Sequence, residues 1–179
     1  PVRAVRLEAA RVLAGVPLDW LSDGHRVTLT RTLEEYRASQ LTNAERAETH
    51  LNLGVLAVQL GRYDDAEGAY RTALRIDSGF VAAHLNLADL YRQQGREAEG
   101  EKVLRDALAV TEEPAHVEHS LGLLLVRQGQ LPEALRLLRS AAERRPDLVR
   151  YAYVHGVALQ STGNALGALE VLSTAHERH

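Results

Sequence analysis

The sequence predicts an all-helical protein built from repeated helix pairs, and three observations lead to this prediction. Leu and Ala together make up 56 of the 179 residues, while Ile and Phe occur once each. Leu and Ala favour helices, and residues that favour sheets are few. Small residues also recur every 34 positions along most of the chain. A fixed period of this length is typical of repeat architectures.

Four columns of small residues define the repeat. They are Gly54, Ala88, Gly122 and Gly156; Gly61, Gly95, Gly129 and Gly163; Ala66, Gly100, Ala134 and Ala168; and Ala73, Ala107, Ala141 and Ala175. Within each column the spacing is 34 residues with no insertion. The columns predict four repeats, over residues 47–80, 81–114, 115–148 and 149–179.

Each repeat is expected to hold two helices. In the first repeat, one helix ends before Gly61, where a left-handed helix cap costs glycine least, and the second runs from about Tyr63 to Ile76. Gly54 and Ala66 mark the point where the two helices cross closely. We expect Tyr70 to fill the gap to the next repeat, and the same of its counterparts Leu104, Leu138 and Leu172.

These repeats resemble the tetratricopeptide repeat (TPR). Residues 50–54 (HLNLG) and 84–88 (HLNLA) carry the resemblance, which covers residues 47–179. The family's usual Trp is replaced by His50, His84, Glu118 and Ala152, of which we expect the two histidines to be half-buried. The resemblance implies a right-handed α-solenoid whose first helices line a concave groove.

Residues 1–46 do not follow the period and are interpreted as an N-terminal helical cap. A helix is expected from Val2 to Ala14 and a second from about His25 to Gln40, capped by Ser22 or Asp23. The stripe of Val27, Leu29, Leu33 and Tyr36 on this second helix is expected to pack on the first repeat.

Two further resemblances concern the cap and the chain as a whole. Residues 5–13 (VRLEAARVL) resemble the second helix of a HEAT repeat, and the order of cap and repeats resembles the C-terminal region of bacterial multihaem-cytochrome-type proteins. The second resemblance implies an exported, periplasmic protein whose haem domain lies upstream; without it, a cytoplasmic location is the default. The start at Pro1 and the absence of Met indicate a piece of a longer protein, and 20 Arg against one Lys indicate a GC-rich bacterial genome.

Composition and motifs argue against several functions. A net charge of −3 gives no general attraction to nucleic acid or anionic membranes, and no apolar run approaches the ~20 residues of a membrane span. The absence of Cys excludes disulfides and thiolate chemistry. No phosphate loop, dinucleotide fingerprint or nucleophile elbow is present. We therefore predict no catalytic residues, no cofactor and no metal. His155 is interpreted separately, as a core histidine.

The TPR resemblance implies which residues line the groove. They are Leu51, Asn52, Val55, Gln59, Leu85, Asn86, Asp89, Arg92, Gln93, His116, His119, Leu123, Arg127, Arg150, Tyr153, Val157 and Gln160. Asn52 and Asn86 either bond the backbone of a peptide ligand, since an amide both donates and accepts, or are simply the family's common residue there. His116 and His119 share one helix face, but two imidazoles alone do not make a metal site.

The sequence thus predicts a non-enzymatic scaffold that binds a peptide or partner protein in this groove. The alternative is a targeting or regulatory arm of a larger enzyme or multihaem electron-transfer protein. The last helix carries Leu166, Leu169, Val171 and Leu172 with no further repeat to cover them. An uncovered apolar surface favours contact with another molecule, most simply a second copy, which predicts a possible homodimer through this end. The alternatives are that residues beyond this sequence cover it, or that Arg178 and the two terminal histidines shield it.

Overall fold

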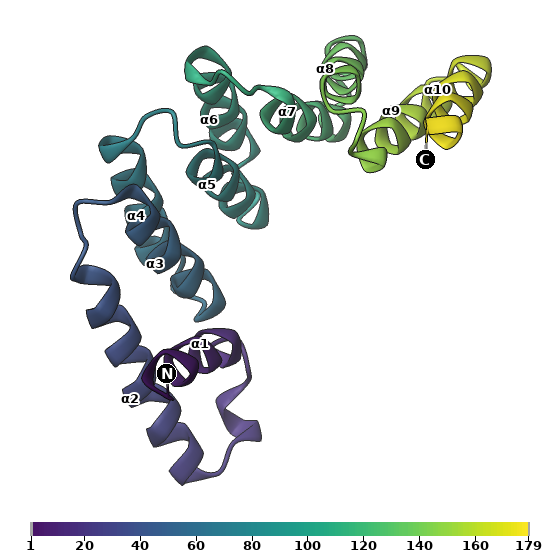
Figure 1. The fold of residues 1–179 in the computed structure, drawn as a ribbon. Coiled ribbons are helices and arrows are strands. Elements are labelled where there is room, and N and C mark those ends of the chain that lie inside the picture. Colours follow the sequence, from purple (N-terminus) through teal and green to yellow (C-terminus); the bar gives the residue numbers. More distant parts are fainter. Residues whose placement is uncertain (1, 179) are drawn as a thin grey trace. The chain divides into compact units, whose positions relative to one another are not determined.

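The computed structural model describes residues 2–178, and every regular element in that range is helical (Figure 1). Pro1 and His179, the outermost residues of the predicted cap and fourth repeat, lie outside the described residues. In chain order the elements are α1 Val2–Leu13, the 3₁₀ helix η1 Leu18–Trp20, α2 Asp23–Leu41, α3 Ala47–Gln59, α4 Tyr63–Ile76, α5 Val81–Gln93, α6 Glu97–Val110, α7 Ala115–Arg127, α8 Leu131–Arg144, α9 Val149–Ser161 and α10 Ala165–Arg178. Among these helices, none combines the length and the apolar character needed to cross a membrane. The all-helical prediction is confirmed over this range.

The chain divides into two compact units, one ending at Leu90 and the other starting at Tyr91. The division falls inside α5, so α1 to α4 belong to the first compact unit and α6 to α10 to the second. The boundary that the sequence predicts between cap and repeats, at residues 46 and 47, lies inside the first compact unit. The division into a cap and four repeats therefore stays a prediction.

Each first helix of a repeat is followed by a glycine in the left-handed backbone region. The φ angles are +70° at Gly61, +71° at Gly95, +75° at Gly129 and +83° at Gly163. In the first repeat the next N–H, that of Arg62, donates to the carbonyl of Ala57 at 2.8 Å and closes the helix end. A Cβ disfavours this conformation, so glycine is the residue that fits. The predicted glycine caps are confirmed.

The two helices of a repeat cross so closely that a side chain would not fit at three of the crossings. A Cβ on Gly54 would overlap the ring of Tyr70, and one on Gly122 would lie 2.8 Å from Cγ of Leu138. Gly156 stands in the same relation to Leu172, at 2.9 Å. The crossing prediction is confirmed: the large partners lie over the glycine of their own repeat. The expectation that they also fill the gap to the next repeat stays a prediction.

The cap packs on the first repeat through Tyr36. This ring, 6% exposed, forms a buried cluster with Ala14 and Leu56 of α3, and Leu33 lies against the cluster. Leu29 is also buried. Three members of the predicted α2 stripe therefore face inward.

Two details of the cap differ from the prediction. Val27 is 69% exposed, so it does not join the core. The second helix begins at Asp23 rather than at His25, and Ser22 precedes it without a capping bond from its side chain. The Ser22 hydroxyl instead lies 3.0 Å from His25 Nδ1, which takes the place of the expected backbone N–H.

Candidate functional site: the first-helix face

The predicted groove residues lie on α3, α5, α7 and α9, the first helices of the four repeats. We call the side of these helices that carries them the first-helix face. Residues of this set up to Asp89 belong to the first compact unit, and those from Arg92 onward belong to the second. The face is therefore a set of local surfaces, each built by its own helix and immediate neighbours.

The first-helix face is most exposed on α9. Tyr153 is 59% exposed and Val157 is 48% exposed, and they stand one helical turn apart. Arg150, one turn before Tyr153, is also exposed. On the opposite side of the helix, Tyr151 and His155 are buried, as predicted for His155. α9 thus presents an aromatic ring, an aliphatic side chain and a cation to solvent.

An aromatic cluster supports this surface from below. The His119 ring of α7 stacks on the Tyr151 ring with centroids 4.1 Å apart and an interplanar angle of 19°. His116 approaches the same ring edge-on at 5.9 Å, and the Arg150 guanidinium carbon lies 5.2 Å from its centroid. Three of the predicted groove residues therefore meet on one tyrosine that the sequence analysis did not single out.

Tyr151 occupies a position of the repeat that is buried throughout the chain. Its counterparts one to three periods earlier are Thr49, Ala83 and Val117, and all four positions are buried. A residue in a column that is buried in every repeat must place its side chain in the core. The tyrosine at this position in the fourth repeat is the largest of the four, so its ring reaches α7.

His119 itself is not accessible to a ligand. Only 8% of it is exposed, and its Nδ1 is buried without a hydrogen-bond partner among residues 2–178, as is the Tyr151 hydroxyl. Burial lowers the pKa of His119 to about 4, and the nearby charges of Arg150 and His116 act in the same direction. The sequence placed His119 in the groove; the structure makes it a neutral support beneath the accessible His116 and Arg150.

Three other predicted groove residues already hold bonds within the chain. Asn52 Nδ2 donates to Gln40 Oε1 of α2 at 3.1 Å, and Asn86 Nδ2 donates at 2.8 Å to a carbonyl one turn back in its own helix. Arg127 Nε donates to Glu97 Oε1 at 3.0 Å. A ligand that uses any of these donors has to replace an existing bond.

The other predicted groove residues lie at the surface of their helices. They are half-buried or exposed: Leu51, Val55, Leu85, Asp89, Arg92, Gln93, Leu123 and Gln160. Gln59 is half-buried and belongs to the hollow described next. Among residues 2–178, no three His, Asp or Glu side chains come together in a way that could hold a metal ion.

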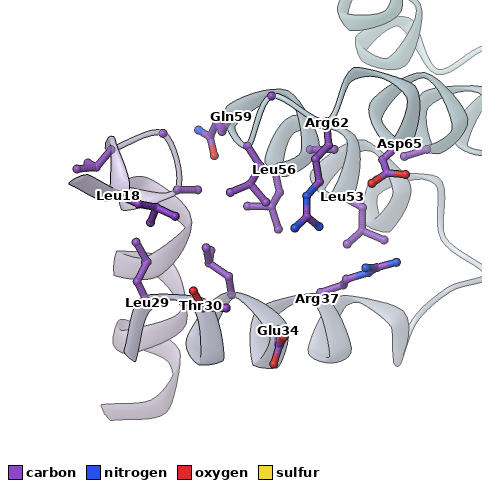
Figure 2. A pocket seen from close by; sticks show the side chains of 18 of the residues that line it. Leu18, Leu29, Thr30, Glu34, Arg37, Leu53, Leu56, Gln59, Arg62 and Asp65 are labelled. Atoms are coloured by element: carbon purple, nitrogen blue, oxygen red, sulfur yellow. The ribbon is translucent and has the colours of Figure 1, made fainter. Parts of the chain in front are cut away.

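A cavity that the sequence did not indicate lies between the cap and the first repeat. Its volume is about 790 Å³, and its walls come from residues 14–18, α2, α3 and the start of α4 (Figure 2). Leu29, Leu53 and Leu56 supply apolar wall, while Arg37 and Arg62 stand at opposite sides. We call it the cap cavity. It depends on the angle between α2 and α3, which the pattern of apolar residues does not set.

Comparison with known families identifies the repeats. Two family models described as tetratricopeptide repeat match the chain, one over residues 57–124 and the other over residues 31–79 and 119–178. The second match alone spans more than half of the chain. This chain belongs to the tetratricopeptide repeat family. None of the curated proteins matches its sequence.

Solved TPR structures share the fold. A crystal structure of MamA is 20% identical with a TM-score of 0.67, over 82% of this chain and 85% of that one. YrrB, described as a TPR protein with an unusual peptide-binding site, is 22% identical with a TM-score of 0.61, over 96% and 84%. TTC0263, described as a thermophilic TPR protein in Thermus thermophilus, is 22% identical with a TM-score of 0.61, over 88% and 92%. The predicted TPR-type α-solenoid fold is confirmed; the HEAT-like and multihaem resemblances remain predictions.

Two histidines replace the family's Trp and take a definite role in these TPRs. His50 Nε2 donates to the carbonyl of Ala44 at 2.9 Å, and His84 Nε2 donates to that of Ser78, also at 2.9 Å. Each carbonyl lies six residues before its histidine, in the turn that leads into the first helix. His50 is half-buried as predicted and His84 is 7% exposed. The imidazoles thus close the turn by a hydrogen bond, where Trp would fill space.

Proposed function

We propose that this TPR protein is a non-enzymatic scaffold that binds a peptide of a partner protein on its first-helix face. Membership of the TPR family supports the role of protein-interaction scaffold. The observation that supports the first-helix face is the exposed row of Arg150, Tyr153 and Val157 on α9. Aromatic side chains and arginine are the residues that most often anchor protein interfaces.

The row is suited to a peptide with apolar and acidic side chains. Tyr153 and Val157 offer apolar area that a peptide side chain would cover, and Arg150 offers a charge-assisted hydrogen bond to a carboxylate or carbonyl. The buried aromatic cluster below holds α7 and α9 in place, because His119 and Tyr151 are stacked and close-packed. A surface that does not rearrange on binding loses less entropy.

The test is peptide selection followed by substitution on α9. A random peptide library displayed on phage is panned against the chain, and the affinity of a selected peptide is measured by fluorescence polarisation. The double change Tyr153→Ala and Val157→Ala is expected to weaken binding at least about tenfold, since loss of an interface anchor costs about 2 kcal/mol. Thermal unfolding should stay unchanged because both side chains are exposed.

Val27→Ala is the matched control. Val27 is 69% exposed but lies on α2, in the cap. Its replacement should leave the affinity as it was. Unchanged affinity in the α9 double variant, equal loss in the control, or failure to select any peptide would each contradict the proposal.

A further inference from the structure

The cap cavity is a separate hollow that the first-helix face does not include. Gln59 is the single predicted groove residue in its lining. The apolar part of the wall consists mainly of leucines, among them Leu29, Leu53 and Leu56. At about 790 Å³ the cavity has the size of a typical ligand pocket, which is large enough for several side chains of a peptide.

The cavity exists because α2 does not cover the first repeat as later repeats cover one another. Leu53 is half-buried, whereas its counterparts in the later repeats are buried: Leu87 is 3% exposed, Leu121 0% and His155 7%. His155 lies within reach of the charges of Arg139 and Glu143 on α8, the second helix of the preceding repeat. Within residues 2–178, α3 is preceded by the cap helix α2 and not by the second helix of a repeat. Part of the apolar surface of α3 that a second helix would cover therefore stays open.

Small residues on α4 enlarge the hollow. Gly68 and Ala69 line it from the first turns of α4. A Cβ on Gly68 would meet no atom within 4 Å, so the space beside this glycine is empty. In the later repeats the counterparts of Gly68 are the larger Lys102, Arg136 and Glu170.

Two guanidinium groups face the cavity from opposite walls. In Figure 2 Arg62 points into the cavity from the turn before α4, and Arg37 extends along α2 to the side where Asp65 lies. Neither has an ion-pair or side-chain hydrogen-bond partner among residues 2–178. Asp65 lies at the outer edge, and Glu34 points to the far side of α2 (Figure 2). Two like charges that face one space repel, and an anion placed between them removes that repulsion.

The third feature is an acceptor without a donor. Gln59 Oε1 is buried and has no hydrogen-bond partner within residues 2–178. A buried carbonyl oxygen left unpaired costs free energy, and a backbone N–H of a bound peptide would satisfy it once the Gln59 side chain turns toward the cavity. The cavity wall thus combines apolar area, two arginines, one unpaired acceptor and three carboxylates, those of Glu34, Asp64 and Asp65.

We propose that the cap cavity binds a short segment of a partner protein that carries an aliphatic side chain next to a carboxylate. The aliphatic side chain packs among Leu29, Leu53 and Leu56, the carboxylate lies between Arg37 and Arg62, and a backbone N–H donates to Gln59. This binding does not depend on the first-helix face. A peptide can occupy either site without the other.

The test uses three fluorescein-labelled peptides of one length, blocked at both ends, that alternate Leu with Glu, Gln or Lys. The Leu/Glu peptide is expected to bind the chain at least tenfold more tightly than the Leu/Gln peptide, because only the former brings carboxylates to the two arginines. The Leu/Lys peptide tests the opposite hypothesis, in which Asp64 and Asp65 attract a cationic peptide. Binding of Leu/Lys as tight as that of Leu/Glu overturns the proposal, as does absence of Leu/Glu binding.

Paired glycine variants locate the peptide. Gly68→Leu places a side chain in the cavity, where its Cβ meets no atom within 4 Å, and is expected to weaken Leu/Glu binding at least tenfold. Gly24→Leu is the matched control, since a Cβ there also meets nothing within 4 Å but Gly24 does not line the cavity. Arg37→Gln with Arg62→Gln should remove the preference for Leu/Glu over Leu/Gln. Equal binding by both glycine variants, or a preference that survives the arginine changes, overturns the proposal, whereas loss of binding in the α9 double variant would assign the peptide to the first-helix face instead.

Discussion

Burial decides the charge of His119, and the charge decides what the residue can do. Stacked on Tyr151 and 8% exposed, the ring is kept neutral at pH 7 because a proton on it would lose most of its hydration. A neutral ring can pack, but it cannot attract a carboxylate. The residue's contribution is therefore to the rigidity of the α7–α9 surface and not to the charge of a binding site.

The burial of His119 predicts that the free energy of unfolding decreases at acidic pH. The pKa of His119 is about 4 in the folded chain against 6.5 for the ordinary group, so between these pH values the unfolded chain binds a proton that the folded chain does not. The free energy of unfolding should be fully retained above pH ~6.5 and decrease by about 2–3 kcal/mol as the pH falls to ~4. His155, whose pKa burial also lowers, adds to the same trend.

Chemical denaturation at several pH values checks this expectation. His119→Phe keeps a stacked ring and removes the titrating group, so its unfolding free energy should depend less on pH across this window. If the wild-type chain and His119→Phe lose stability in parallel between pH 6.5 and 4, the effect has another source.

At the scale of the helix pair, the small residues set how closely the helices approach. Gly122 on α7 lies under Leu138 of α8, and the carbonyl oxygen of Ala134 would also be 3.4 Å from a Cβ placed there. Gly68 on α4 is equally helical but has open space beside it. The two glycines therefore separate the effect of crowding from the effect of helix propensity.

The same substitution at the two glycines should have opposite effects. Gly122→Leu has to push α8 away and is expected to lower the free energy of unfolding by about 1–3 kcal/mol, the usual cost of overpacking. Gly68→Leu removes a flexible residue from a helix and should raise it by about 0.5–1 kcal/mol. Thermal or urea unfolding of both variants measures the difference, and a similar loss in both would show that the crossing is not tight at Gly122.

The 34-residue period of the sequence predicted the features that recur in each repeat. Glycine columns located the helix ends and the close crossings, because both demand a residue without a Cβ at a fixed place. The columns did not show that Tyr70 and Leu138 lie over the glycine of their own repeat, since spacing along the chain does not tell which neighbour a side chain meets. Nor did they show that His119 would be buried, which depends on a single tyrosine in the next repeat.

The cap cavity lies beyond what the sequence pattern can predict for a different reason. The stripe on α2 correctly indicated Leu29, Leu33 and Tyr36 as inward-facing residues. A stripe states which side of a helix is apolar, but it leaves open the angle at which the helix meets its neighbour. The half-burial of Leu53 follows from that angle.

At the scale of the whole molecule, α10 carries an exposed apolar surface in addition to exposed apolar residues of the cap such as Trp20 and Val2. Leu166 is 83% exposed, Leu169 63% and Leu172 37%. In the first repeat, Asp64 and Glu67 occupy the positions of Leu166 and Leu169, and in the second repeat Ala98 and Glu101 occupy them. A row of exposed leucines on one helix is characteristic of a contact surface.

We propose that this surface of α10 associates with a second copy of the chain, because covering the leucines removes apolar area from water. Light scattering over a range of protein concentrations should show a mass that rises above that of the monomer. Leu166→Glu combined with Leu169→Glu should restore the monomer without lowering thermal stability, since both side chains are already exposed in the folded chain. The α9 double variant should associate as the wild type does, because it leaves α10 intact. A wild-type chain that stays monomeric at high micromolar concentration would contradict self-association through these leucines.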